Sequence, residues 1–128
     1  MKANELRIGN LVNYNEGGIF KVIGIYEFGL DVEDNIEATY MEYENFHPIS
    51  LTEERLLKFG FSIINENSAG KEYGYVIDGV YSSALTFIHW KTTKNAGKFF
   101  RGDLQLKYVH QLQNLYFALT GQELEVER

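Results

Sequence analysis

The sequence contains no cysteine, which excludes disulfide bonds and thiolate metal ligands. Only one of its 128 residues is proline, and no apolar run is long enough to cross a bilayer as a helix. Residues 1–5 carry charge at once and lack the apolar core of a secretory signal. We therefore expect a cytoplasmic protein that makes no use of a membrane.

The charge is negative overall and unevenly distributed. The formal net charge of −6 argues against non-specific binding to nucleic acid or to anionic lipid. Residues 1–60 hold five Lys and Arg against eleven Asp and Glu, whereas residues 61–128 hold seven of each. Hydrophobic residues make up 45% and charged residues 23%, values of an ordinary globular chain. The chain is long enough for one domain, or for two very small ones sharing a core.

Residues 1–50 predict a small β-barrel. Short alternating segments, separated by turns rich in Gly and Asn, predict strands at 11–14, 19–25, 30–33, 36–43 and 47–49. Gly24 interrupts the second of these and predicts a bulge. The spacing of Leu6, Gly9, Asn10 and Val12, followed by a hairpin, resembles the start of an SH3-like barrel.

Residues 51–128 predict a helix–antiparallel sheet–helix unit, α-β-β-β-α, packed on the barrel without a linker. Thr52 and Gly60 are placed to cap and to end a short helix. Strands follow at 61–65, 73–78 and 84–90, the last apolar on both faces and so central in its sheet, and shorter extended pieces at 99–100 and 104–106. Apolar residues at helical spacing predict a final amphipathic helix over 107–120. We expect the two parts to form one cooperative folding unit.

No motif for catalysis or metal binding is present. There is no phosphate-binding glycine loop, nucleophile elbow or zinc-protease motif. His47, His89 and His110 lie far apart and have no ligand spacing. We therefore assign no catalytic residue, metal ligand or cofactor.

Segment 90–101 is the first of two candidate binding surfaces. It interleaves aromatic and basic residues, as single-stranded nucleic acid requires: positive charge for phosphates and ring faces for bases. The candidate contacts are Trp90, Lys91, Lys94, Lys98 and Arg101. The alternative is a hairpin whose aromatic residues enter the core while its lysines are solvated.

The second candidate surface is one stripe of the final helix. His110, Gln113, Asn114 and Phe117 follow the i, i+3, i+4, i+7 spacing of a single helix face. Amides and an imidazole beside an exposed ring are typical of a protein interface. In the alternative interpretation, Phe117 packs against the barrel and the amides join the two halves internally.

Three blocks of the chain resemble a known family. They are residues 2–10 (KANELRIGN), 48–61 (PISLTEERLLKFGF) and 109–121 (VHQLQNLYFALTG). They are similar, in the same order, to blocks in a family of small Bacteroidetes proteins of unassigned role, often encoded near prophage or mobile-element genes. Arg55 stands where many members have an aromatic residue. The resemblance implies a cytoplasmic accessory protein of a phage or mobile element, and it carries over no catalytic residue.

We therefore expect a non-enzymatic binding protein whose partner is another protein or a second copy of the chain. A nucleic-acid accessory factor that uses segment 90–101 is the first alternative, and a small enzyme of unknown class is the second. An interaction module predicts an exposed apolar patch rimmed by amides. A nucleic-acid factor predicts lysines converging on one face, and an enzyme predicts a deep pocket with convergent polar groups.

Overall fold

The computed structural model describes residues 3–15, 17–77 and 79–124. The fold is mixed α+β, and all of the strand pairings between its described residues are antiparallel. The chain divides into two compact units. Unit 1 comprises Met1–Ser50 with Tyr108–Leu115, and unit 2 comprises Leu51–Lys107 with Tyr116–Arg128. The final helix, α2 (Val109–Thr120), therefore contributes residues to both units, although the sequence interpretation assigned all of it to the second part.

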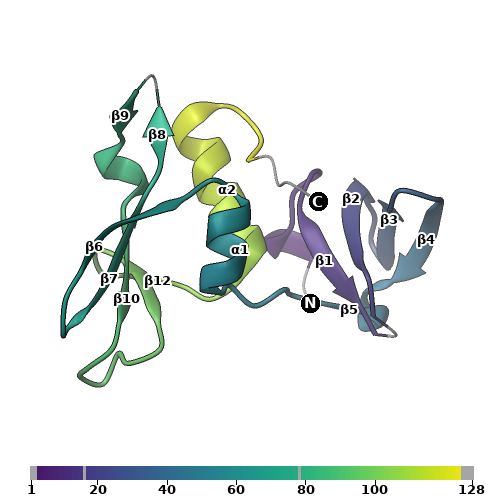
Figure 1. Cartoon of the computed structure of the whole chain (residues 1–128). Coiled ribbons are helices and arrows are strands. Elements are labelled where there is room, and N and C mark those ends of the chain that lie inside the picture. The colour runs from purple at the N-terminus through teal and green to yellow at the C-terminus, as the bar shows by residue number, and fades with distance from the viewer. Residues whose placement is uncertain (1–2, 16, 78, 125–128) are drawn as a thin grey trace. The chain divides into compact units, whose positions relative to one another are not determined.

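Unit 1 is built on a five-stranded sheet in the order β4-β3-β2-β1-β5, curled into a half-barrel (Figure 1). Its elements are η1 (Ala3–Glu5), β1 (Leu11–Tyr14), β2 (Ile19–Ile25), β3 (Gly29–Glu33), β4 (Ala38–Glu42), η2 (Tyr43–Asn45) and β5 (Phe46–His47). The predicted bulge is confirmed, because the β2–β3 register shifts between Val22 and Gly24. The expected strand at 36–43 is shorter, because Asp34 Oδ1 accepts from the backbone N–H groups of Ile36 and Glu37 and so forms a turn there.

The core of unit 1 lies inside the curled sheet. Alternate residues of neighbouring strands point inward, as the two-residue period of a strand requires. Val12, Val22, Leu30 and Val32 are completely buried. The remaining buried members of this cluster are Leu6, Phe20 and Phe46. This core fixes the outward direction of the residues between them.

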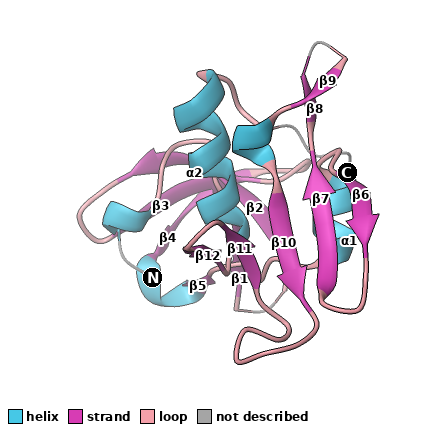
Figure 2. Cartoon of the chain, turned by 90° about the vertical axis from the view of Figure 1, so that its left-hand side faces the viewer, coloured by secondary structure: helices cyan, strands magenta, loops and turns pink. Residues whose placement is uncertain are grey.

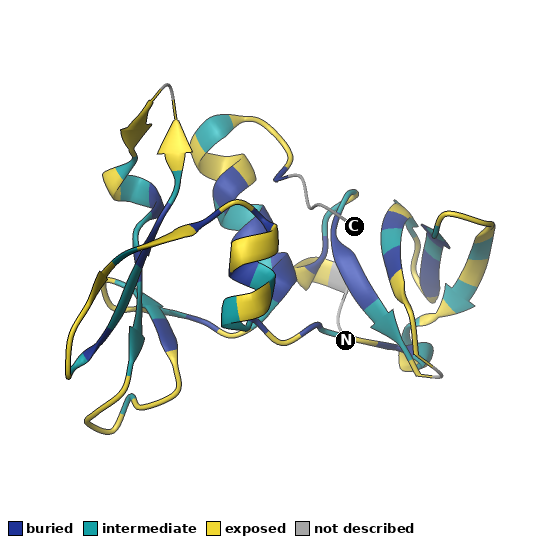
Figure 3. Cartoon of the chain, viewed as in Figure 1, coloured by how far each residue is buried: buried dark blue, intermediate teal, exposed yellow. Residues whose placement is uncertain are grey.

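Unit 2 contains a short helix, a second five-stranded sheet and a separate hairpin. Its elements are α1 (Glu53–Lys58), β6 (Ser62–Glu66), β7 (Gly70–Gly74), β8 (Val76–Ile77), β9 (Val80–Tyr81), η3 (Ser83–Leu85), β10 (Phe87–Trp90), β11 (Phe99–Arg101) and β12 (Leu104–Leu106). The sheet order is β12-β11-β10-β7-β6, which confirms the central position expected for the strand ending at Trp90. Strands β8 and β9 pair with each other as a separate hairpin, and Figure 3 shows that the residues of both strands are exposed.

The main sheet of unit 2 has five strands where three were predicted, because the two short extended pieces join it; two of the predicted strand segments are in addition shorter than expected. Segment 73–78 ends its sheet pairing at Gly74 and starts the separate hairpin at Val76. Segment 84–90 begins with a 3₁₀ turn, in which Leu85 N–H donates to the Ser82 carbonyl, and becomes a strand at Phe87. The pieces near 99–100 and 104–106 pair as β11 and β12.

The ends of α1 follow the predicted chemistry. Thr52 Oγ1 accepts a hydrogen bond of 3.2 Å from the Arg55 backbone N–H, and Gly60 adopts a left-handed φ of 97° just after the helix. Within the described part of the chain, neither α1 nor α2 nor any 3₁₀ turn has the length and apolar character needed to span a membrane.

Candidate binding surfaces

The helix stripe predicted as a protein interface is largely turned inward. His110 and Gln113 are each only 2% exposed, and Asn114 is partly buried. Gln113 Oε1 accepts a 2.8 Å bond from the Leu11 N–H, and its Nε2 donates to the Gly9 carbonyl. Two of the four side chains therefore have almost no surface to offer a partner.

The remaining two members of the stripe differ from each other. Asn114 Oδ1 accepts a 2.8 Å bond from Asn10 Nδ2, and its Nδ2 donates to the Glu5 carbonyl. Phe117, by contrast, is 38% exposed. A partner-binding role for this stripe stays a prediction, and it depends on Phe117.

His110 is a buried imidazole in unit 1. Its ring stacks on Tyr108, with the planes 9° apart, and Nδ1 has no hydrogen-bond partner among the described residues. Burial lowers the pKa of His110, and the negative charge of Glu5 partly opposes that effect. The neutral form is therefore favoured in the folded state.

The five predicted nucleic-acid contacts do not share one environment. Lys94 and Lys98 are exposed in the β10–β11 loop, and no described acidic side chain pairs with either. Lys91 instead bonds Glu66 Oε2 at 3.0 Å. Arg101 Nε donates to the Ala84 carbonyl at 2.6 Å. Trp90 is partly exposed at the end of β10.

Strand register assigns Trp90 and Phe100 to the same face of the second sheet. Phe100 and Glu72 both lie opposite Ile88, and Trp90 is two residues further along the same strand. Gln105 lies opposite Phe100 on β12. We call Glu72, Ile88, Trp90, Phe100 and Gln105 the open sheet face. All five are partly exposed, and Figure 2 shows this sheet with α1 behind it.

The opposite face of that sheet forms the core of unit 2. Tyr73, Phe87, Phe99 and Leu106 alternate with the residues of the open sheet face and are buried. Phe87 packs against Phe61 with ring centroids 5.4 Å apart. The aromatic rings on that side are thus buried, whereas Trp90 and Phe100 on the other side stay partly exposed.

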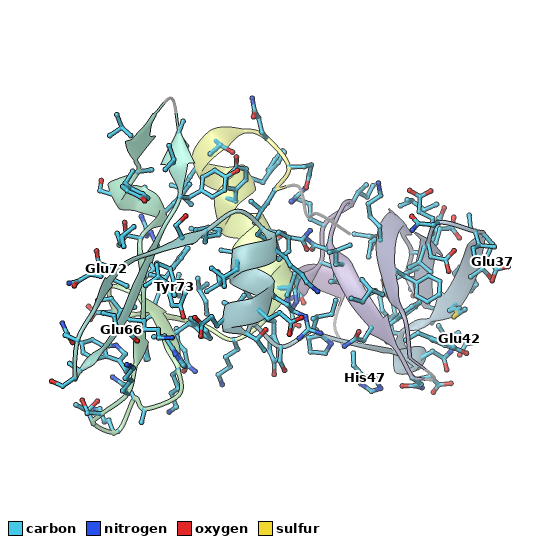
Figure 4. The ribbon with its side chains drawn as sticks, in the orientation of Figure 1. Glu37, Glu42, His47, Glu66, Glu72 and Tyr73 are labelled. Atoms are coloured by element: carbon cyan, nitrogen blue, oxygen red, sulfur yellow. The ribbon has the colours of Figure 1, made fainter. Side chains whose placement is uncertain are left out.

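A network of charges joins α1 to the sheet of unit 2. Lys71 Nζ lies 3.1 Å from Glu53 Oε1 and 3.6 Å from Glu66 Oε2. Glu66, which is labelled in Figure 4, also pairs with Lys91. Burial raises the pKa of the Tyr73 phenol to about 12, and the charges of Glu53 and Glu66 add to the shift. Tyr73 therefore stays protonated at neutral pH, and the network ties the helix to the sheet.

Unit 1 carries an acidic strand edge that the sequence analysis did not identify. β4 ends the sheet, so one of its sides pairs with no described strand. Glu37, Tyr40, Glu42 and Glu44 are exposed along this strand and the turns that flank it, and Figure 4 labels Glu37 and Glu42. We call these four residues the β4 edge. A pocket of about 420 Å³ beside it is lined by residues that include Tyr14, Tyr40, Glu42 and Glu44.

A signal for this edge was present in the sequence. Residues 22–54 contain nine Asp and Glu and no Lys or Arg. The whole negative balance belongs to unit 1, which has three basic residues against nine acidic ones, whereas unit 2 has nine of each. Totals taken over 1–60 and 61–128 give the same balances of −6 and 0, because the two acidic and two basic residues of α1 cancel.

Among residues 3–15, 17–77 and 79–124, no three His, Asp or Glu side chains come together as a possible metal site. Comparison with protein-family models, with curated proteins and with solved structures finds no match to this chain.

Proposed function

We propose that the protein is a non-enzymatic binding protein whose unit 1 binds a basic, extended segment of a protein partner along the β4 edge. The observation that carries the proposal is a strand whose outer edge pairs with no described strand and which presents an exposed tyrosine between glutamates. An extended peptide can add to such a strand through main-chain hydrogen bonds, and pockets for alternate side chains provide specificity.

The backbone of β4 has groups available for this pairing. Asp34 N–H donates to the Glu37 carbonyl, and Tyr43 N–H donates to the Phe28 carbonyl. Hydrogen-bonded pairs alternate along an antiparallel ladder, so between these two pairs it is the backbone groups of Thr39 and Met41 that bond to β3. The peptide groups of Tyr40 and Glu42 then face the unpaired side, where a partner strand can reach them.

The side chains select for positive charge. Tyr40 is 49% exposed and offers a ring face for cation–π contact with Lys or Arg. Glu37, Glu42 and Glu44 supply carboxylates, and unit 1 contains only three basic residues. Lys21, one of those three, is occupied by Glu33 at 3.3 Å. A basic peptide therefore meets attraction along the whole edge, while an acidic one is repelled.

The finer features expected from the sequence belong to the same proposal. The order β4-β3-β2-β1-β5 supports an SH3-like barrel for residues 1–50, and α1 preceding the second sheet supports a helix–sheet–helix arrangement for residues 51–128. A cytoplasmic accessory role in a phage or mobile element of Bacteroidetes rests on the resemblance of the three sequence blocks. Self-association through Phe117 is the competing protein-binding hypothesis, supported by its exposed ring.

The test is a binding titration of the full chain with a fluorescent peptide of alternating Lys and Val. The double variant Glu42→Lys with Glu44→Lys should weaken binding roughly tenfold, because two attractive charges become repulsive. Glu54→Lys with Asp103→Lys is the matched control: both residues are exposed in unit 2, and each double variant changes the net charge from −6 to −2. An equal loss of peptide affinity in both double variants would mean that only the net charge of the chain matters, and it would contradict the proposal.

Strand addition has a separate test on the peptide. N-methylation of alternate residues removes the main-chain donors without changing side-chain charge, so binding should be lost when the methylated face meets β4. If the two peptides methylated on the even and on the odd residues both bind as tightly as the unmodified peptide, strand addition is excluded. If Phe117→Asp abolishes binding while the Glu42 and Glu44 variant retains it, the interface lies on α2 instead.

A further inference from the structure

The open sheet face has a composition that differs from that of the acidic half-barrel. It carries an indole, a phenyl ring and an isoleucine on two neighbouring strands. Ile88 lies directly opposite Phe100, and Trp90 lies diagonally from it, so the two aromatic rings occupy successive positions of one face. Flat ring systems exposed in series on a sheet provide stacking surfaces for bases.

A pocket of about 220 Å³ adjoins Trp90 on this face. Ile88, Glu72, Asn65 and Asn67 are among the other residues that line it. Gly70, opposite Trp90, forms part of its wall, and a Cβ there would lie 2.5 Å from the His89 carbonyl oxygen. The volume is below the ~300–1,000 Å³ of pockets for drug-sized ligands, so it suits a single planar ring system. The Asn65 amide and the Glu72 carboxylate supply donors and acceptors for the edge of such a ring, whereas Asn67 Oδ1 already accepts from the N–H groups of Ala69 and Gly70.

The loop that follows Trp90 presents unpaired positive charge. Residues 79–102 contain four Lys and Arg and no Asp or Glu. Lys91 and Arg101 have partners, whereas Lys94 and Lys98 are exposed without an acidic partner among the described residues. These two lysines are therefore available to a polyanion.

Backbone hydrogen bonds hold this loop in a defined shape. Gly97 N–H donates to the Trp90 carbonyl at 2.9 Å, and Lys98 N–H donates to the Asn95 carbonyl at 3.0 Å. Thr93 has a φ of 70°, a conformation that is costly for a β-branched residue and that persists only when its surroundings impose it. The backbone of Lys98 is thus held against that of Trp90, whose N–H donates to the Lys98 carbonyl, and Lys94 lies in the same short loop. A loop ordered before binding lowers the entropic cost of binding.

The negative net charge of the chain is not an obstacle on this surface. The excess of six negative charges belongs to unit 1, and unit 2 is balanced. At physiological ionic strength, charges further apart than about 8 Å are largely screened when solvent-exposed. A bound chain therefore responds to the local lysines, and Glu72 lies where a base edge rather than a phosphate can meet it.

We infer that the open sheet face binds single-stranded nucleic acid, with Trp90 and Phe100 stacking on bases and Lys94 and Lys98 contacting phosphates. This site is separate from the β4 edge and goes beyond the protein-binding function proposed for it. Stacking accepts any base, so the interaction is expected to show little sequence preference.

The experiment titrates the full chain with a fluorescein-labelled oligothymidylate of twelve nucleotides at several salt concentrations. Trp90 is the only tryptophan of the chain, so its intrinsic fluorescence reports stacking at this position without a label. We expect quenching of Trp90 that saturates together with the anisotropy of the oligonucleotide. Binding should weaken as salt rises, because each neutralised phosphate releases counterions.

Two variants separate the roles of charge and stacking. Lys94→Glu with Lys98→Glu should reduce the slope of log K against log salt by about 1.4, the value for two single-strand phosphate contacts. Lys58→Glu with Lys107→Glu, two exposed lysines of unit 2, makes the same change in net charge and should leave the slope unchanged. Phe100→Ala should lower affinity roughly 5- to 150-fold with the salt slope unaltered.

Three outcomes would overturn the inference. Binding to the oligonucleotide without quenching of Trp90 places the contact elsewhere. Heparin that binds as tightly as the oligonucleotide, and with the same dependence on Lys94 and Lys98, identifies a general polyanion surface without base stacking. No salt-dependent binding at physiological ionic strength excludes a nucleic-acid partner. Far-UV circular dichroism of each variant checks that the fold is retained.

Discussion

The Gln113 side chain forms hydrogen bonds with buried backbone groups and is not available to a partner at the surface. Its amide oxygen accepts from Leu11 N–H and its nitrogen donates to the Gly9 carbonyl, on either side of Asn10. Buried backbone groups require partners, and an amide can supply both a donor and an acceptor. The i, i+3, i+4, i+7 spacing was sufficient to group Gln113 with its neighbours on α2. It could not reveal that this stripe meets the start of β1, because that contact joins residues about a hundred positions apart.

His110 makes stability depend on pH. Its pKa is lowered in the folded state from an ordinary value near 6.5, so the unfolded chain binds the proton more readily. The contribution to stability is therefore fully present above about pH 6.5 and is lost as the pH falls toward the lowered folded-state pKa.

Urea unfolding at pH 7.5 and at pH 5.5 measures this effect. The native chain should lose more free energy of unfolding between these two pH values than His110→Phe, which has no titrating ring. Taking this difference removes the contributions of carboxylates such as Glu5, which are present in both proteins. The same pH dependence in both would mean that His110 does not titrate differently on folding.

At the scale of elements, periodicity identified long segments well and their interruptions poorly. The apolar spacing of α2 and the two-sided apolar pattern of β10 led to correct predictions, because burial imposes both patterns. The break between β7 and β8 was missed. A Cβ at Gly74 would lie 2.9 Å from the Tyr81 ring, so this glycine lets the hairpin turn back against the strand. That packing depends on a tertiary contact that alternation of residue types does not encode.

Leu112 is the most informative position for testing the helix. It is completely buried, and its truncation leaves a cavity, so Leu112→Ala should cost about 2–5 kcal/mol. Leu119→Ala is the control on the same helix, because Leu119 is 43% exposed and should cost less than about 1 kcal/mol. Both are measured by chemical denaturation. Similar costs for the two variants would show that the apolar stripe of α2 does not contribute a specific core.

For the whole molecule, charge and folding follow different divisions. Charge separates the units cleanly, with the negative excess in unit 1 and a balance in unit 2. The fold does not separate the two units in the same way, because the single helix α2 supplies residues to both of them. The candidate surfaces follow the charge division: a basic peptide is proposed for the acidic unit and a polyanion for the neutral one. The excess of acidic residues in the first part is visible in the sequence. The position of β4 at the exposed edge of its sheet is visible only in the strand order.

Cooperative melting is the prediction at this scale. Each unit alone is too small to bury a large core, and neither can lose α2 without affecting the other. Differential scanning calorimetry should therefore give one transition whose calorimetric and van't Hoff enthalpies agree. Two resolved transitions would show that the units unfold independently.

The shared helix also affects the order of events during synthesis. All five strands of the half-barrel are synthesised before residue 50, but Tyr108–Leu115, which complete unit 1, are made only after another 57 residues. At ordinary translation speeds this interval is about 3–12 s. During that time the nascent half-barrel exposes the N–H groups and apolar side chains that α2 later covers. Unit 1 is thus the first part of the chain to be synthesised but completes its fold late. During that interval, chaperones or rapid translation must limit aggregation through its exposed apolar side chains.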